Sequence, residues 1–118
     1  MNKIIINGNL TNDMEVIVGK NYTVGNFTIA NNEGFGDNQR TTFVRCSIFG
    51  EKRVESLEKY LLKGAKVLLN GKLEITSKED KDGYKNYTSI IVDELEILKF
   101  VNDEDEKEDK KDRKRGRR

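Results

Sequence analysis

The sequence predicts a small all-β domain with a single helix, and three features of the chain point to this class. Five short runs rich in Ile, Val, Phe, Tyr and Thr recur between residues 3 and 98, which is typical of strands. One segment, residues 54–61, shows apolar residues at helical spacing. Glycines stand inside several of the runs, where they weaken a flat sheet but permit strong coiling.

The expected strands occupy residues 3–10, 22–30, 41–50, 65–75 and 86–98. Between the third and the fourth, Val54, Leu57 and Leu61 share one face of a helix of about three turns, and Gly64 suits its end. Five strands with this helix fit a five-stranded Greek-key barrel, the OB-fold, whose helix caps one end. A β-sandwich and an α+β sheet stay open, because short apolar runs do not specify topology.

The chain is long enough for one domain and has little room for a second. It has 118 residues, of which 36% are charged and 35% are hydrophobic, a low apolar share for a compact domain. After Val101 the sequence reads NDEDEKEDKKDRKRGRR and contains no hydrophobic residue. Such a segment cannot bury enough surface to offset its ordering entropy. We therefore expect a folded domain over 1–98 and a disordered tail over 99–118, acidic first and basic afterwards.

Composition excludes several classes of function. The chain has no His and no Trp, which removes His-based catalytic triads and His-containing zinc sites. One Cys cannot form an internal disulfide, which favours a reducing compartment such as the cytoplasm. No segment approaches the roughly 20 apolar residues of a membrane span, and no signal-peptide pattern opens the chain. The acidic residues of the domain are scattered, so we predict neither a metal nor a cofactor. We also predict no enzyme activity, and this includes that of a metal-dependent nuclease.

The third strand, TTFVRCSIFG, gives the most informative pattern, because alternate side chains of a strand point to opposite faces. One face carries Val44, Cys46 and Ile48, which predicts a core face with an unreactive buried thiol. The other face holds two rings and a cation, from Phe43, Arg45, Ser47 and Phe49. Exposed rings there require a partner, which is a nucleic acid, a subunit interface or a second layer of core.

Rings beside cations on a sheet suit single-stranded nucleic acid, because unpaired bases stack on rings and phosphates need positive charge. The candidate stacking residues come from the third strand and from the three loops near it: Phe35, Phe43, Phe49, Tyr22, Tyr84 and Tyr87. Arg45 stands between Phe43 and Phe49, and Arg40 ends the loop that holds Phe35. These positions lie where an OB-fold usually binds oligonucleotides.

Several segments resemble, in order, the bacterial and phage single-stranded DNA-binding protein family. They are NKIIINGNLTNDMEV, NFTIA, TTFVRCSIFG, EKYLLKGAKVLLNGKL and the Tyr87 position. The resemblance implies an OB-fold that binds single-stranded DNA with little sequence preference during replication, recombination and repair. It also implies a protein that is not an enzyme and that forms a homo-oligomer, a tetramer first and a dimer second.

The resemblance assigns residues as well. It places base stacking at Phe35, Phe43 and Phe49, the first two of which are usually Trp in the family. It places phosphate contacts at positions matched here by Lys3, Arg45, Lys52 and Lys63, and Lys72 in the GKL segment is added to this set.

The chain departs from the family pattern in three places. Past Leu73 the family tends to place basic residues and another Trp, whereas this chain reads Glu74, Thr76 and Ser77 before Lys78. A His that often supports tetramer contacts is Val44 here. The family's acidic tail ends in a Pro-Phe that docks partner proteins, but this sequence ends RKRGRR, so docking of that kind is not expected. The alternative function is a primosome-type OB-fold module for protein interaction in a replication restart complex.

Overall fold

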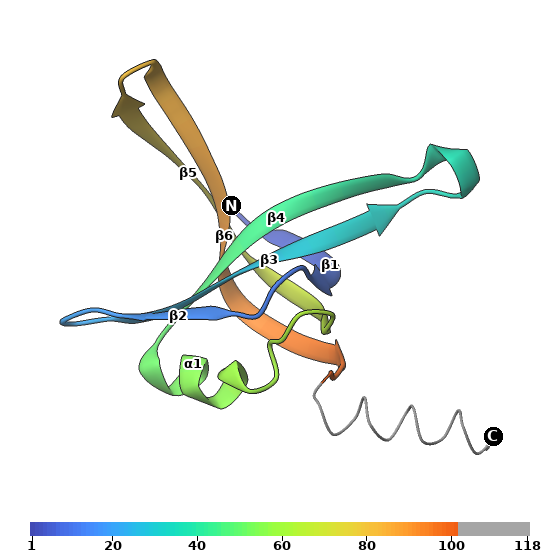
Figure 1. Cartoon of the computed structure of the whole chain (residues 1–118), viewed down its shortest axis with the longest axis horizontal. Helices are drawn as coiled ribbons and strands as arrows, with labels where there is room; N and C mark the ends of the chain where they lie inside the picture. Colours follow the sequence, from blue (N-terminus) through green and yellow to red (C-terminus); the bar gives the residue numbers. More distant parts are fainter. Residues whose placement is uncertain (102–118) are drawn as a thin grey trace.

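The computed structural model describes residues 1–101, so the tail expected over 99–118 lies outside the described residues from residue 102 onward. The elements are, in chain order, β1 (Ile4–Leu10), β2 (Glu15–Val18), β3 (Thr23–Glu33), the short 3-10 turn η1 (Gly36–Asn38), β4 (Arg40–Phe49), α1 (Glu51–Glu58), β5 (Lys66–Asp80) and β6 (Gly83–Lys99). Figure 1 shows a central barrel with α1 at its lower end and three hairpin arms, β2–β3, β3–β4 and β5–β6, that extend from it.

Five strands close the barrel. They follow the order β1-β5-β6-β4-β3, and β1 pairs back onto β3 through Asn9 with Ala30 and Leu10 with Ile29. β4 and β6 run parallel, and the other paired strands run antiparallel. The prediction of a five-stranded Greek-key OB-fold with one helix before the fourth barrel strand is confirmed, and the sandwich and the α+β sheet are excluded.

The short strand β2 was not predicted. This strand pairs with β3 beyond the residues that β3 shares with β1. Glu15 pairs with Asn26, and Val18 pairs with Thr23. Met14, which precedes β2, is buried, and a Cβ at Gly25 would lie 2.4 Å from its sulfur. The glycine therefore leaves room for Met14 at the point where the first barrel strand is interrupted.

The core forms from the inner faces of the strands and from two residues on the helical side. Ile29, Ile48, Leu69 and Ile90 are almost fully inaccessible, and Val54 and Leu61 close the lower end of the barrel. Further buried members include Leu10, Phe27, Cys46, Val67 and Val92. The predicted alternation of the third barrel strand is confirmed, because Cys46 and Ile48 are buried and Val44 packs against the same core.

The helix is shorter than predicted, with eight residues and about two turns instead of three. It begins after Gly50, whose φ of 117° is accessible to glycine. It ends at Glu58, and beyond it the Leu61 carbonyl accepts a hydrogen bond from the Met14 amide at 2.9 Å. Gly64 lies in the following turn, with φ 93°, and its amide donates to the Leu10 carbonyl.

A β-bulge on β6 lies opposite Asn70 and Gly71 of β5: Asn70 pairs with Glu94 and Gly71 with Val92, which leaves Asp93 unpaired and increases the local twist. A Cβ at Gly71 would lie 2.1 Å from the Ile91 carbonyl oxygen, so only glycine fits this close approach of two strands. The glycine expected to permit coiling in the fourth barrel strand therefore lies at a close approach of β5 to β6.

The ordered chain passes the expected boundary at residue 98. β6 ends at Lys99, and the ring of Phe100 meets the Tyr60 ring edge-on, with 5.3 Å between centroids. Among residues 1–101, no helix has the length and apolar character that a membrane crossing needs.

Burial raises the pKa of the Cys46 thiol from 9.0 to about 12. The native protein should therefore resist a thiol reagent at pH 8, whereas the urea-unfolded chain should react. Because the folded pKa is the higher one, the free energy of unfolding should fall as pH rises from about 9 towards 12. Rapid labelling of the folded protein would show that Cys46 is accessible, contrary to this structure.

Candidate nucleic-acid interface

The outer face of β4 carries the rings and the cation that the sequence pattern predicted. Phe43 is 66% exposed and Phe49 is 48% exposed, and Arg45 between them is also exposed. The alternative in which the two rings form a second layer of core is therefore wrong for this chain. Each ring can be shielded from solvent only by a partner from outside the barrel.

Three strands place their outer side chains in rows, which the register fixes because paired residues share a face of the sheet. Thr28 of β3 lies beside Arg45, which in turn lies beside Ser89 of β6. One row further along β4, Ser47 lies between Asn26 and Ile91. The rows are about 6.6–6.8 Å apart, because each strand advances two residues between them. Two rows, polar except for Ile91, thus separate Phe43 from Phe49.

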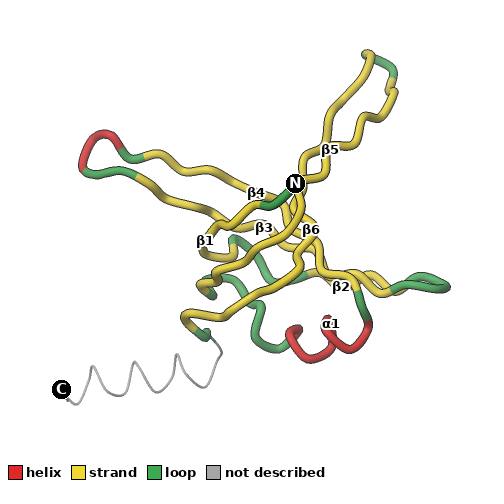
Figure 2. The backbone as a smooth tube through the Cα atoms, turned by 180° about the vertical axis from the view of Figure 1, so that it is seen from behind, coloured by secondary structure: helices red, strands yellow, loops and turns green. Residues whose placement is uncertain are grey.

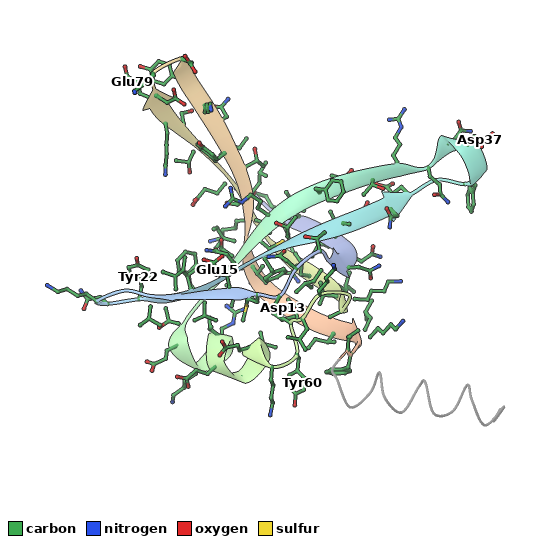
Figure 3. The ribbon with its side chains drawn as sticks, in the orientation of Figure 1. Asp13, Glu15, Tyr22, Asp37, Tyr60 and Glu79 are labelled. Carbon is green, nitrogen blue, oxygen red and sulfur yellow. The ribbon has the colours of Figure 1, made fainter. Side chains whose placement is uncertain are left out.

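A groove of about 650 Å³ lies over this outer face. Its lining comes from the segment before β2, the β2–β3–β4 sheet and the base of the β5–β6 arm: Asn12, Glu15, Asn26, Phe27, Thr28, Arg45, Cys46, Ser47, Thr76, Lys78, Tyr87, Thr88 and Ser89. The Lys78 ammonium lies 5.6 Å from the centre of the Tyr87 ring. Figure 3 shows Glu15 near the point where the arms leave the barrel. The groove therefore joins a ring, two cations and a polar floor.

The two tyrosines of the β5–β6 arm lie on opposite faces. Tyr87 pairs with Thr76 and shares the face of Ser89, which lines the groove. Tyr84 pairs with Glu79 and is three residues away along β6, an odd spacing that turns its side chain to the other face. Tyr84 is 76% exposed. The structure thus brings Tyr87 to the groove and leaves Tyr84 outside it.

A second hollow of about 580 Å³ lies at the other end of β4. Tyr22, Phe49 and Lys20 line it, at the tip of the β2–β3 hairpin. A Cβ at Gly19 would lie 2.1 Å from the Tyr22 ring, so the ring packs over the glycine backbone. The predicted rings Tyr22 and Phe49 are therefore brought together, beside a lysine that the sequence analysis did not select.

Two predicted residues lie far along the β3–β4 arm. Phe35 sits at its tip, next to η1, and is 91% exposed, and Arg40 opens β4 opposite Glu33. Figure 2 shows this tip well away from the body of the barrel. A nucleic-acid strand bound in the groove would reach Phe35 only if it also followed the β3–β4 arm.

The remaining predicted cations are spread around the barrel. Lys72 lies on the outer face beside Ile91, which places it in the row of Ser47, and the exposed Lys3 precedes β1. Lys52 lies on α1. Lys63 follows α1, and its amide donates to the Asp13 carboxylate at 2.8 Å. The structure does not bring Lys52 and Lys63 to the groove lining.

Sequence reasoning missed Lys78, Asn26 and Glu15 as groove residues. Lys78 stands nine residues before Tyr87, so only the β5–β6 register places the two together. Residues 1–101 contain no group of three His, Cys, Asp or Glu side chains arranged to hold a metal.

Comparison with known proteins agrees with this geometry. Residues 1–98 match the model of the Single-strand binding protein family. This chain belongs to that family. The chain is 34% identical over 103 residues to a Clostridium perfringens protein named single-stranded DNA-binding protein, and 31% identical over 114 residues to single-stranded DNA-binding protein 1 of Staphylococcus aureus. These matches cover 86% and 92% of this chain.

The matched segments span 66% of the Clostridium protein and 72% of the Staphylococcus protein. A solved structure described as the Plasmodium falciparum SSB in complex with ssDNA has a TM-score of 0.75 and 26% identity. It covers 83% of this chain and 95% of the solved chain. The family consists of non-enzymatic DNA-binding proteins. As a member of this family, the chain is not an enzyme.

Proposed function

We propose that this family member binds single-stranded DNA with little sequence preference along the outer face of β4. The observation that carries the proposal is the pair of exposed rings on one strand, Phe43 and Phe49, with Arg45 between them. Bases stack on the rings and on Tyr87, while Arg45 and Lys78 neutralise phosphates. Family membership and the names of the relatives support the same function.

The test is an oligonucleotide titration at several salt concentrations. Because cations hold the phosphates, log K should fall linearly with log salt, with a slope of about 0.7 per phosphate neutralised. Oligo-dT should bind far more tightly than a duplex of the same length, because duplex bases are already stacked on one another. Equal binding of duplex and oligo-dT, or a salt-independent affinity, would contradict the proposal.

Phe35, Tyr22, Arg40, Lys3 and Lys72 extend the proposed contact surface beyond the groove. A strand that follows the β3–β4 arm would meet Phe35 and Arg40, and one that passes the β2–β3 tip would meet Tyr22. Alanine substitution of each, assayed by oligonucleotide titration, identifies which of them the strand contacts.

We further propose a homo-oligomer, a tetramer before a dimer, that acts in the cytoplasm on strands exposed by replication, recombination and repair. One apolar side chain on the outer face of β1, Ile5, is exposed, which supports self-association. Sedimentation with and without oligo-dT measures the assembly, and a monomer under both conditions would contradict it.

A further inference from the structure

The outer face of the sheet becomes apolar at the base of the β2–β3 hairpin. Phe49 of β4 pairs with Val24 of β3. Val24 pairs in turn with Ile17 of β2, so the three side chains lie in one row on the outer face. Val24 is only 7% exposed, whereas Phe49 and Ile17 are 48% and 39% exposed. This row is therefore an apolar platform, with Val24 as its floor.

The turn between β2 and β3 holds the Tyr22 ring in place next to this platform, in the same hollow as Phe49. The Gly19 amide donates a hydrogen bond of 2.8 Å to the Tyr22 carbonyl, which closes the turn. Three carbons of the Tyr22 ring lie within 2.7 Å of the point where a Cβ at Gly19 would stand. The glycine therefore lets the ring lie against the backbone, and Tyr22 remains 54% exposed.

The charges of this hollow differ from those of the groove. The hollow is lined by one cation, Lys20, and by one carboxylate, Glu51 at the start of α1. The groove has two cations against one carboxylate. The hollow thus offers a phosphate no net attraction, whereas its rings and apolar floor suit the flat face of a base.

Resting on the proposed function, we propose that this hollow is a base subsite. An unpaired base of the bound strand stacks there on the Tyr22 and Phe49 rings, through contacts that salt does not weaken. The continuity of the outer face supports this occupant, because the platform is the row next to Ser47, which lines the groove. The strand therefore leaves the groove over the β2–β3 hairpin. Gly19 is a positioning residue that determines where the Tyr22 ring lies.

The Tyr22→Trp variant tests the stacking directly, because the chain contains no Trp and the new indole is then the single one. Oligo-dT should quench its fluorescence, since a base stacked on an indole quenches it. Tyr84→Trp is the matched control, because Tyr84 is exposed on the face of the β5–β6 arm that turns away from the groove. Its fluorescence should stay unchanged when anisotropy of a labelled oligonucleotide shows that the protein is saturated.

Two further variants separate the position of the ring from its presence. Tyr22→Ala should raise the dissociation constant for oligo-dT about fivefold, the low end of what one stacked base contributes, with an unchanged salt slope. Gly19→Ala should give a similar loss although the tyrosine is kept. The φ of Gly19 is not positive, so alanine fits the backbone and displaces the ring alone. Tyr22→Phe keeps the ring and should bind like the wild type.

The outcomes distinguish this subsite from the proposed function. Saturated binding without quenching in Tyr22→Trp, or an affinity loss in Tyr22→Ala that disappears at high salt, would overturn the base subsite alone. A change in the fluorescence of Tyr22→Trp with protein concentration in the absence of DNA would identify a second copy as the occupant and would also overturn it. Failure of the wild-type protein to bind oligo-dT would overturn the proposed function as well.

Discussion

Replacing both Phe43 and Phe49 by alanine should weaken binding to oligo-dT by about 2–6 kcal/mol, since one base stacked on one ring contributes about 1–3 kcal/mol. Both rings are exposed, so the substitutions remove binding surface and leave the core intact. The two positions are six residues apart on β4, about 20 Å along the strand, so their effects should be close to additive. Fluorescence anisotropy of a labelled oligonucleotide measures the loss.

The matched variant replaces both residues by tryptophan, which keeps a ring at each position. It should bind at least as tightly as the wild type, because the indole offers a larger stacking face. A thermal melt checks that both variants are folded. If the folded double-alanine variant binds oligo-dT with wild-type affinity, the rings do not receive bases, and a subunit interface becomes the better explanation of their exposure.

Replacing Gly71 by alanine should destabilise the barrel by about 1–3 kcal/mol, the usual cost of overpacking a tight site. The new Cβ would lie 2.1 Å from the Ile91 carbonyl oxygen and 2.9 Å from a methyl of Ile90. Backbone atoms cannot move aside as a flexible side chain can, so β5 and β6 must separate. Ile91 pairs with Ser47, so the same shift should also disturb the groove floor. Urea denaturation measures the free energy of unfolding.

The control for this variant is Lys72→Ala at the next residue. Lys72 is exposed, so its loss should change the free energy of unfolding by no more than about 0.5 kcal/mol. If Gly71→Ala proves as stable as the wild type, β5 and β6 must lie further apart at the bulge than this structure places them.

Much of the fold was predictable because strand periodicity and turn chemistry are local properties. The alternation in TTFVRCSIFG predicted which side chains of β4 are buried and which are exposed, and the structure confirms it. The end of α1 was not predicted, because the apolar spacing continues to Leu61, whereas Leu61 lies beyond the helix and its carbonyl accepts from the Met14 amide, 47 residues away. The short strand β2 was likewise not predictable, because it is defined by its pairing with β3.

The candidate site was predictable where its residues share one strand and unpredictable where it depends on register. Phe43, Arg45 and Phe49 could be grouped from their spacing alone. Lys78 and Glu15 enter the groove from other strands, through pairings that no single segment encodes. The predicted strand began at residue 86 and left Tyr84 in a turn, whereas β6 begins at Gly83, so that the odd spacing places Tyr84 and Tyr87 on opposite faces.

These two tyrosines give the most direct test of the proposal that DNA lies on the outer face of β4 and β6. They stand three residues apart on one arm, so their alanine variants differ mainly in the face from which a ring is removed. Tyr87→Ala should weaken oligo-dT binding by about 1–3 kcal/mol, whereas Tyr84→Ala should change it by less than about 0.5 kcal/mol. Equal losses, or a larger loss for Tyr84→Ala, would contradict the proposed path of the strand.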